Sequence, residues 1–88
     1  MQITLKLHAS LTDFLPRDED GRRPRYNQLA VEVPEASDVQ SVIDRYRLPP
    51  RQVHLVLVNG VYIAPGERDR RVLQDGDALA IWPQIAGG

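Results

Sequence analysis

The sequence predicts an α+β fold, in which one main helix covers one face of a mixed β-sheet. Stretches near the start of the chain and again after residue 53 carry the apolar patterns of strands. Between them, residues 37–46 carry an apolar stripe at helical spacing. The length of 88 residues is that of a single domain with a small core.

The first two predicted strands are residues 2–8 and 29–33, which we expect to pair with each other. In the first strand apolar residues alternate with polar ones, so Lys6 and His8 lie on the face away from the core. A short apolar cluster at residues 11–15 predicts one or two helical turns after this strand.

Residues 16–28 form a polar stretch with a glycine and two prolines, which predicts a loop. Its arginines could bind an anion, but a solvated surface loop is the more common structure for such a composition. The main helix follows, with Ser37 as the expected N-cap and Gln40 as its capping-box partner. The helix must end before the two prolines at 49–50.

The remaining strands follow the helix. Residues 53–58 are nearly all apolar, which predicts a central strand covered on both faces. Asn59-Gly60 predicts a tight hairpin leading into a return strand at 61–63. The last strand is expected at 78–82, where Pro83 ends it.

This order of elements is compatible with the β-grasp arrangement, in which the first and last strands lie side by side at the centre. Spacing alone does not single it out. We expect one β-grasp domain at residues 1–83 and a flexible C-terminal tail at 84–88, because these last residues show no periodicity.

Composition excludes several classes of protein. The formal net charge of −1 argues against a non-specific nucleic-acid binder. The absence of cysteine excludes disulfides, thiolate metal sites and a cysteine nucleophile. There is no apolar run long enough for a signal peptide or a membrane span. We therefore expect a cytoplasmic protein that is not an enzyme and that binds no metal.

The Gly-Gly end is the main candidate for chemistry. Glycine has no Cβ, so Gly87 and Gly88 can enter a narrow channel in a partner enzyme. Ile85 and Ala86 could add apolar contacts along that channel. A carboxylate becomes reactive toward a sulfur nucleophile only after activation, for example as an acyl-adenylate. Two glycines alone are weak evidence for this chemistry, because a frayed chain end without any function can also carry two glycines.

The segment DGDALAIWP followed by QIAGG resembles the C-terminus of the ubiquitin-like sulfur carriers, the family that includes the molybdopterin synthase small subunit and the thiamine-pathway carrier. The strand ITLKLHASL and the run into VNG resemble the same family. The polar loop at 16–28 and the single lysine depart from it, which leaves the pathway more open than the chemistry.

The resemblance implies a carrier without a permanently bound cofactor. An ATP-dependent activating enzyme related to the ubiquitin activators would adenylate the carboxylate of Gly88. A persulfide donor would convert it to a thiocarboxylate, and the sulfur would pass to an acceptor. In the molybdopterin branch, the acceptor is bound to a larger synthase subunit, which would be a further partner.

Trp82 is the second candidate. It precedes the tail, and by alternation it lies opposite Leu79 and Ile81, so it should share the open face of the sheet with His8. An exposed tryptophan there suits a partner-binding anchor, although packing at the sheet end explains it equally well. The resemblance favours docking. Tyr62 is a weaker candidate for the same surface.

Other polar residues have simpler interpretations. His8 and His54 lie outside any ligand-spaced motif, and Asp75 and Asp77 are expected as turn residues. The arginines of the segment at 67–71 are expected in a solvated loop, with a charged docking rim as the alternative.

Two further classes of function stay open. A ubiquitin-like modifier would share the fold and the Gly-Gly end, and would form isopeptide bonds with lysines of other proteins. A pure interaction module would tolerate loss of the tail. Within the carrier class, molybdopterin, thiamine and another sulfur-metabolite pathway all remain.

Overall fold

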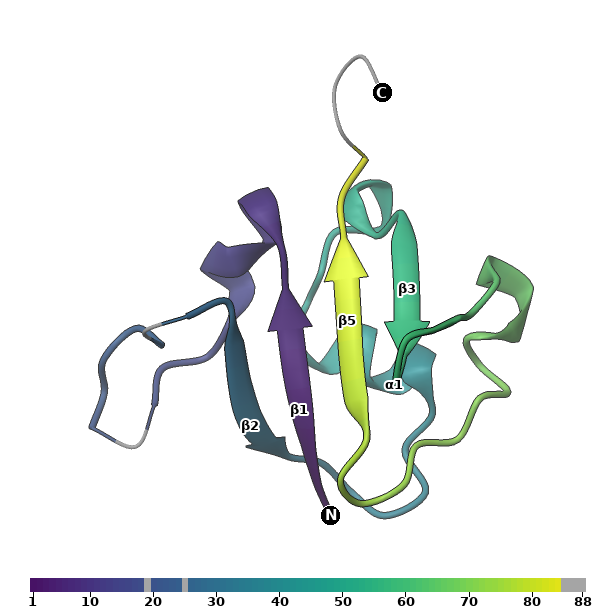
Figure 1. The fold of residues 1–88 in the computed structure, drawn as a ribbon, viewed down its shortest axis with the longest axis horizontal. Coiled ribbons are helices and arrows are strands. Elements are labelled where there is room, and N and C mark those ends of the chain that lie inside the picture. The colour runs from purple at the N-terminus through teal and green to yellow at the C-terminus, as the bar shows by residue number, and fades with distance from the viewer. Residues whose placement is uncertain (19, 25, 85–88) are drawn as a thin grey trace.

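The computed structural model describes residues 1–18, 20–24 and 26–84. The sheet has five strands in the order β2-β1-β5-β3-β4, and Figure 1 labels all of them except the short β4. At its centre, β1 (Gln2–Leu7) and β5 (Ala78–Trp82) pair in parallel. The placement of the first and last strands side by side confirms the predicted β-grasp arrangement.

The outer strands are antiparallel to the central pair. β2 (Gln28–Glu32) pairs with β1, and β3 (Leu55–Val58) pairs with β5. The short strand β4 (Val61–Tyr62) returns beside β3. The predicted hairpin between them is confirmed, because Asn59 and Gly60 both have positive φ, +50° and +82°. Two such residues in sequence suit the right-handed twist of the flanking strands.

Helix α1 (Val39–Arg45) lies across one face of the sheet (Figure 1). The predicted N-cap was wrong by one residue, because Asp38 rather than Ser37 caps the helix. The Asp38 carboxylate accepts a hydrogen bond of 2.7 Å from the backbone N–H of Ser41. Ser37 instead donates its hydroxyl to the carbonyl of Pro34. The side chain of Gln40 donates to Asp44 and so does not complete a capping box.

Three short 3₁₀ helices connect the main elements: η1 (Ala9–Phe14), η2 (Pro50–Gln52) and η3 (Pro65–Glu67). The first of them confirms the helical turns predicted after the opening strand. Helix α1 ends well before the prolines, at Tyr46, and Arg47 turns the chain with a φ of +57°.

The core lies between α1 and the sheet. The side chains that the strands direct toward the helix are buried, as are the three apolar side chains of α1 that face them. Leu11 of η1 closes one end of this core, and Leu73 is buried as well. The fully buried core side chains include Ile3, Leu5, Leu7, Val39, Val56, Leu79 and Ile81.

Asp77 is buried and joins two turns through its hydrogen bonds. Its carboxylate accepts hydrogen bonds from the backbone N–H of Gln74 and the side-chain amide of Asn59, both 2.9 Å long. Burial alone would raise the pKa of Asp77, but these hydrogen bonds and the charge of Arg71 outweigh it and lower the pKa. Asp75 accepts a bond from the N–H of Gln2. Both aspartates therefore act in turns, as predicted.

The prediction that residues 67–71 are a solvated loop was wrong for Arg68. Its side chain is 8% exposed and donates to the carbonyl of His54 at 3.3 Å. The backbone carbonyl of Arg68 also accepts from the N–H of Gln40. Arg68 thus ties this segment to the sheet and to α1, whereas Arg70 is exposed.

Candidate partner-docking face

The face of the sheet away from α1 carries the residues predicted to bind a partner. The pairing register places Lys6 of β1 beside Ala80 of β5, and Leu55 of β3 opposite Trp82. Paired residues point to the same side of a sheet, so these side chains share one surface. We call this surface the open face; its central members are Lys6, His8, Leu55, Leu57, Tyr62, Ala78, Ala80 and Trp82.

His8 and Trp82 lie together where the two central strands end. Their ring centroids are 3.9 Å apart and the rings are nearly parallel, at 4°. Backbone hydrogen bonds fix this end of the sheet, because His8 N–H donates to Ile81 and His54 N–H donates to Trp82. The indole is therefore held in place before any partner arrives, which reduces the entropy lost on docking.

Asn27 completes the arrangement around the imidazole. Its amide nitrogen lies 3.0 Å from Nδ1 of His8. When this amide donates, His8 is neutral with its proton on Nε2. Burial lowers the pKa of His8 from its ordinary value of 6.5, and the charge of Lys6 lowers it further. A neutral ring is the form that the hydrogen bond from this amide favours.

A shallow hollow of about 310 Å³ lies on the open face, between Trp82 and the β3–β4 hairpin. Its walls include His8, Leu57, Ala80 and Lys6. The lining is mainly apolar, and Lys6 is the one lysine or carboxylate residue among the described residues that line it. A partner would find here an apolar anchor point with one positive charge beside it, the usual composition of an interface centre and its rim.

The structure brings Tyr62 onto this surface as well. Tyr62 pairs with Leu57 and is 56% exposed. The sequence missed Leu55 and Leu57, because the run at 53–58 predicted a strand covered on both faces. In the structure Val56 and Val58 are buried, whereas Leu55 and Leu57 are half-buried on the open face. The apolar run was itself the signal that this face needs a cover.

The predicted tail residues Ile85, Ala86, Gly87 and Gly88 lie outside the described residues. Their role, and the division into a domain at 1–83 and a tail at 84–88, stay predictions. Trp82 ends β5 only three residues before Ile85, so the open face and the tail are adjacent along the chain.

Within the described part of the chain, no group of histidine and carboxylate side chains is placed to hold a metal ion. His8 and His54 do not come together in such a group. No helix among the described residues is long and apolar enough to cross a membrane. The open face is the candidate functional site among the described residues.

The β-grasp sheet and its single main helix define a ubiquitin-like protein. The ThiS family matches residues 19–88, which is most of the chain. The chain therefore belongs to the ThiS family, the ubiquitin-like sulfur-carrier family that its last residues resemble. No protein of curated function matches it by sequence.

Solved structures with the same fold come from several ubiquitin-like proteins. SAMP1 from Haloferax volcanii is 24% identical over the whole of both chains, with a TM-score of 0.61. The thiamine biosynthesis protein ThiS from Geobacter metallireducens is 18% identical over 97% of this chain and 99% of its own, with a TM-score of 0.59.

A third similar chain comes from a complex of subunits 1 and 2 of the molybdopterin-converting factor from Helicobacter pylori. It is 13% identical over the whole of both chains, with a TM-score of 0.59. At these identities the likeness shows a shared fold, and the three proteins carry different names within it.

Proposed function

We propose that this protein is a sulfur carrier that works through a thiocarboxylate on Gly88. The observation that carries the proposal is that the family match runs through to residue 88, so that it includes the Gly-Gly end. We assign the docking surface that such a carrier needs to the open face, because Trp82 lies on it and precedes that end by only a few residues along the chain. ATP is a substrate of the activating partner and the carrier itself holds no cofactor.

The chemistry has four steps. An activating enzyme of the ubiquitin-activating class joins the Gly88 carboxylate to the α-phosphate of ATP, and pyrophosphate leaves. The terminal sulfur of a protein persulfide attacks the acyl carbon, and AMP leaves. A thiol then reduces the resulting acyl disulfide, which frees the thiocarboxylate and leaves a disulfide on the donor side. In the final delivery the thiocarboxylate sulfur bonds to an electrophilic carbon of the acceptor and displaces an oxygen leaving group. Water then cleaves the bond between this sulfur and the Gly88 carbonyl carbon, which returns Gly88 to the carboxylate.

The described residues contribute recognition to this cycle. The enzyme must hold the tail beside ATP, so it needs a fixed reference point on the folded domain. Trp82 and its stacked partner His8 provide one, and Tyr62 extends the apolar surface. In this role they are partner-binding residues, and the reacting group is the Gly88 carboxylate alone.

We propose molybdopterin synthesis as the pathway. The aromatic-Pro-x-x-x-Gly-Gly end and the chain length resemble that branch. A chain of the same fold is seen in a complex of subunits 1 and 2 of a molybdopterin-converting factor. By analogy, a larger synthase subunit would hold the pterin precursor and receive the tail. Thiamine or another sulfur-metabolite pathway would use the same carrier chemistry with a different acceptor.

The proposal is tested by intact mass spectrometry. The protein, with no residue added after Gly88, is incubated with ATP, sodium sulfide and an activating enzyme of this class. The expected product is heavier by the replacement of one oxygen atom by sulfur. Deletion of Gly88, or extension beyond it, should abolish the gain while the folded domain persists. A mass gain in the deletion variant would refute the assignment to Gly88.

A second candidate is a ubiquitin-like protein modifier, favoured by the shared fold of SAMP1. The same activated carboxylate would then form an isopeptide bond with a lysine of a target protein. Lys6 is the only lysine of this chain, and it is half-buried on the open face, a poor position for chain building. Lysine-linked conjugates in place of the thiocarboxylate would favour the modifier.

A further inference from the structure

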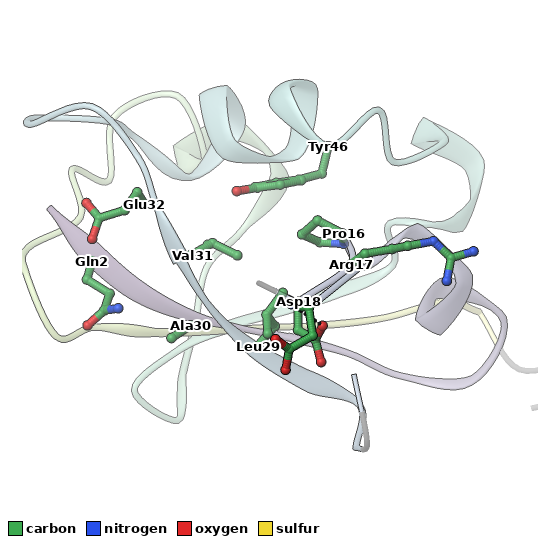
Figure 2. Close-up of a pocket in the computed structure, with 10 residues that line it drawn as sticks. Gln2, Pro16, Arg17, Asp18, Leu29, Ala30, Val31, Glu32 and Tyr46 are labelled. Carbon is green, nitrogen blue, oxygen red and sulfur yellow. Dashed lines mark hydrogen bonds between the residues drawn. The ribbon is translucent and has the colours of Figure 1, made fainter. Parts of the chain in front are cut away.

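A second surface lies at one edge of the sheet, along the outer side of β2. Figure 2 shows a hollow of about 510 Å³ between this strand, Tyr46 at the end of α1 and the segment that begins at Pro16. We call it the β2 groove, and its described walls include Pro16, Asp18, Leu29, Val31, Glu32 and Tyr46. It is remote from Trp82, and the proposed carrier chemistry does not use it.

The backbone of β2 is half unpaired along this groove. Antiparallel pairing joins Leu29 to Leu5 and Val31 to Ile3, and the bonds that Asn27 and Val33 make with β1 fix which residues face inward. The N–H and C=O groups of the intervening residues therefore point outward. No backbone hydrogen bond is seen for these groups among the described residues; they belong to Gln28, Ala30 and Glu32.

The side chains beside this edge are apolar on the side of the helix. Val31 is 6% exposed, and Leu29 and Tyr46 are half-buried. Figure 2 shows Tyr46 extending from α1 over Val31, with Pro16 beside it. A strand added along β2 would direct every second side chain into this space. Those side chains must be apolar to fill it.

The rim of the groove is acidic. Among its described lining residues, Asp18, Asp20 and Glu32 carry three negative charges and Arg17 carries one positive charge, which gives these four residues a net charge of −2. Two hydrogen bonds from backbone N–H groups hold the Asp18 carboxylate in place. Glu32 lies 3.7 Å from the amino group of Met1 but its side chain is 77% exposed. Basic side chains on an added strand would meet this rim.

The edge also lacks the lysine and proline residues that commonly oppose strand addition. Exposed edges are commonly shortened or blocked by lysine or proline. The opposite edge, β4, has only two residues, whereas β2 has five, QLAVE, with neither lysine nor proline. An edge of this length left open beside an apolar hollow is suited to pairing with another chain.

We propose that the β2 groove binds an extended, basic segment of a partner protein by strand addition. Aliphatic side chains at alternate positions of that segment enter the hollow under Tyr46, and lysine or arginine side chains meet the acidic rim. Its backbone pairs with the outward groups of Gln28, Ala30 and Glu32. This site is independent of Gly88, so a carrier could hold one partner here while its tail is engaged elsewhere.

A second copy of the chain is the less suitable occupant. Antiparallel pairing of two β2 edges about Ala30 would bring Gln28 of each copy opposite Glu32 of the other. It would also bring together two rims that each have a net charge of −2. Like charges at such a contact oppose association. The charge therefore selects a basic partner over self-pairing.

The test uses the full chain and an acetylated, amidated peptide of the sequence Lys-Val-Lys-Val-Thr-Val-Lys. NMR titration should give saturable shifts of the amides of Gln28, Ala30 and Glu32, together with slower hydrogen exchange there. A matched peptide with glutamate in place of each lysine should bind at least about tenfold more weakly, because its charges face the acidic rim. In an added strand only every second peptide N–H faces β2. Methylation of that set should abolish pairing, whereas methylation of the other set should leave it intact.

Two variants locate the site. Ala30→Pro removes an outward N–H without removing a bond to β1, and should weaken binding about tenfold. Asp20→Lys should weaken binding of the basic peptide and strengthen that of the acidic one. Asp69→Lys is the matched control, because Asp69 is exposed outside the groove and the change in net charge is the same. It should leave both affinities nearly unchanged.

Three results would overturn the proposal. The first is the absence of saturable shifts at the β2 amides in the folded wild-type protein. The second is a response confined to the open face around Trp82. The third is edge shifts that grow with protein concentration without peptide, which would mean self-pairing. Deletion of Gly88 should not alter peptide binding, so failure of the carrier proposal and failure of this one are distinguishable.

Discussion

The two faces of the sheet arise from alternate residues of the same strands, yet the chain covers them to different degrees. On the helix face Leu5, Val56 and Ile81 are fully buried. On the open face their sequence neighbours Leu55, Leu57 and Trp82 are only half-buried. The helix face is thus complete within this chain, whereas the open face is the surface that we propose for a partner. On that proposal, side chains of the helix face contribute mainly to stability and those of the open face to recognition.

The largest expected effect comes from shortening one leucine on each face of the sheet and comparing the losses of stability. Leu5→Ala leaves a cavity in a packed core and should lower the free energy of unfolding by about 2–5 kcal/mol. Leu57→Ala on the half-buried face should lower it by about 1 kcal/mol or less. Urea unfolding of the two variants measures the difference. Equal losses would mean that the open face is as much a part of the core as the other.

The second prediction concerns recognition without a large loss of stability. Trp82→Ala should weaken docking to the activating enzyme by about 2 kcal/mol, or about thirtyfold, because a buried tryptophan anchor dominates such interfaces. Calorimetric titration measures this affinity, and urea unfolding shows whether the fold persists. Val61→Ala is the control, since Val61 is 64% exposed but lies beside Tyr62 with the opposite orientation. Unchanged affinity in Trp82→Ala would remove the open face from the docking surface.

The smallest expected effect is a pH dependence at the end of the open face. The pKa of His8 is lower in the folded protein than its ordinary value of 6.5, so the unfolded chain takes up the proton first as pH falls. The contribution of His8 to stability is complete above 6.5 and decreases as pH falls through the window below it. Urea unfolding at several pH values measures the slope.

The His8→Gln variant provides the control for that slope. It keeps a polar side chain at the position but removes the titrating ring, so the part of the slope due to His8 should disappear. Asp77 does not interfere, because its pKa is lowered from 3.8 and it titrates in more acidic solution. A gain in stability on acidification that disappears in His8→Gln would reverse the assigned sign.

Local patterns in the sequence were sufficient for most of the fold. Alternation placed β1 and β5, the latter with its observed bounds, and Asn59-Gly60 predicted the hairpin because few other pairs accept two positive φ angles. The shared face of His8 and Trp82 followed from alternation, and Tyr62 was a weaker candidate for the same surface. These features depend on neighbours in the sequence, so the sequence could reveal them.

Features that depend on tertiary contacts were missed. Asp38 and Ser37 are both good N-caps, and only the position of the helix on the sheet decides between them. Arg68 looks like a solvated residue until the segment packs against His54. The stacking of His8 on Trp82 and the nearby amide of Asn27 require the parallel register of β1 and β5. The β2 groove likewise needs the end of α1 beside an edge strand.

The central position of β5 has a consequence for the order of synthesis. This strand lies between β1 and β3, so neither of them has its inner neighbour until residues 78–82 have been made. A ribosome-bound chain that stops earlier has an opened sheet and an exposed core, and such long-range pairing forms late. The domain therefore closes only once the strand that leads into residues 84–88 is present, so a chain truncated before β5 lacks the completed sheet.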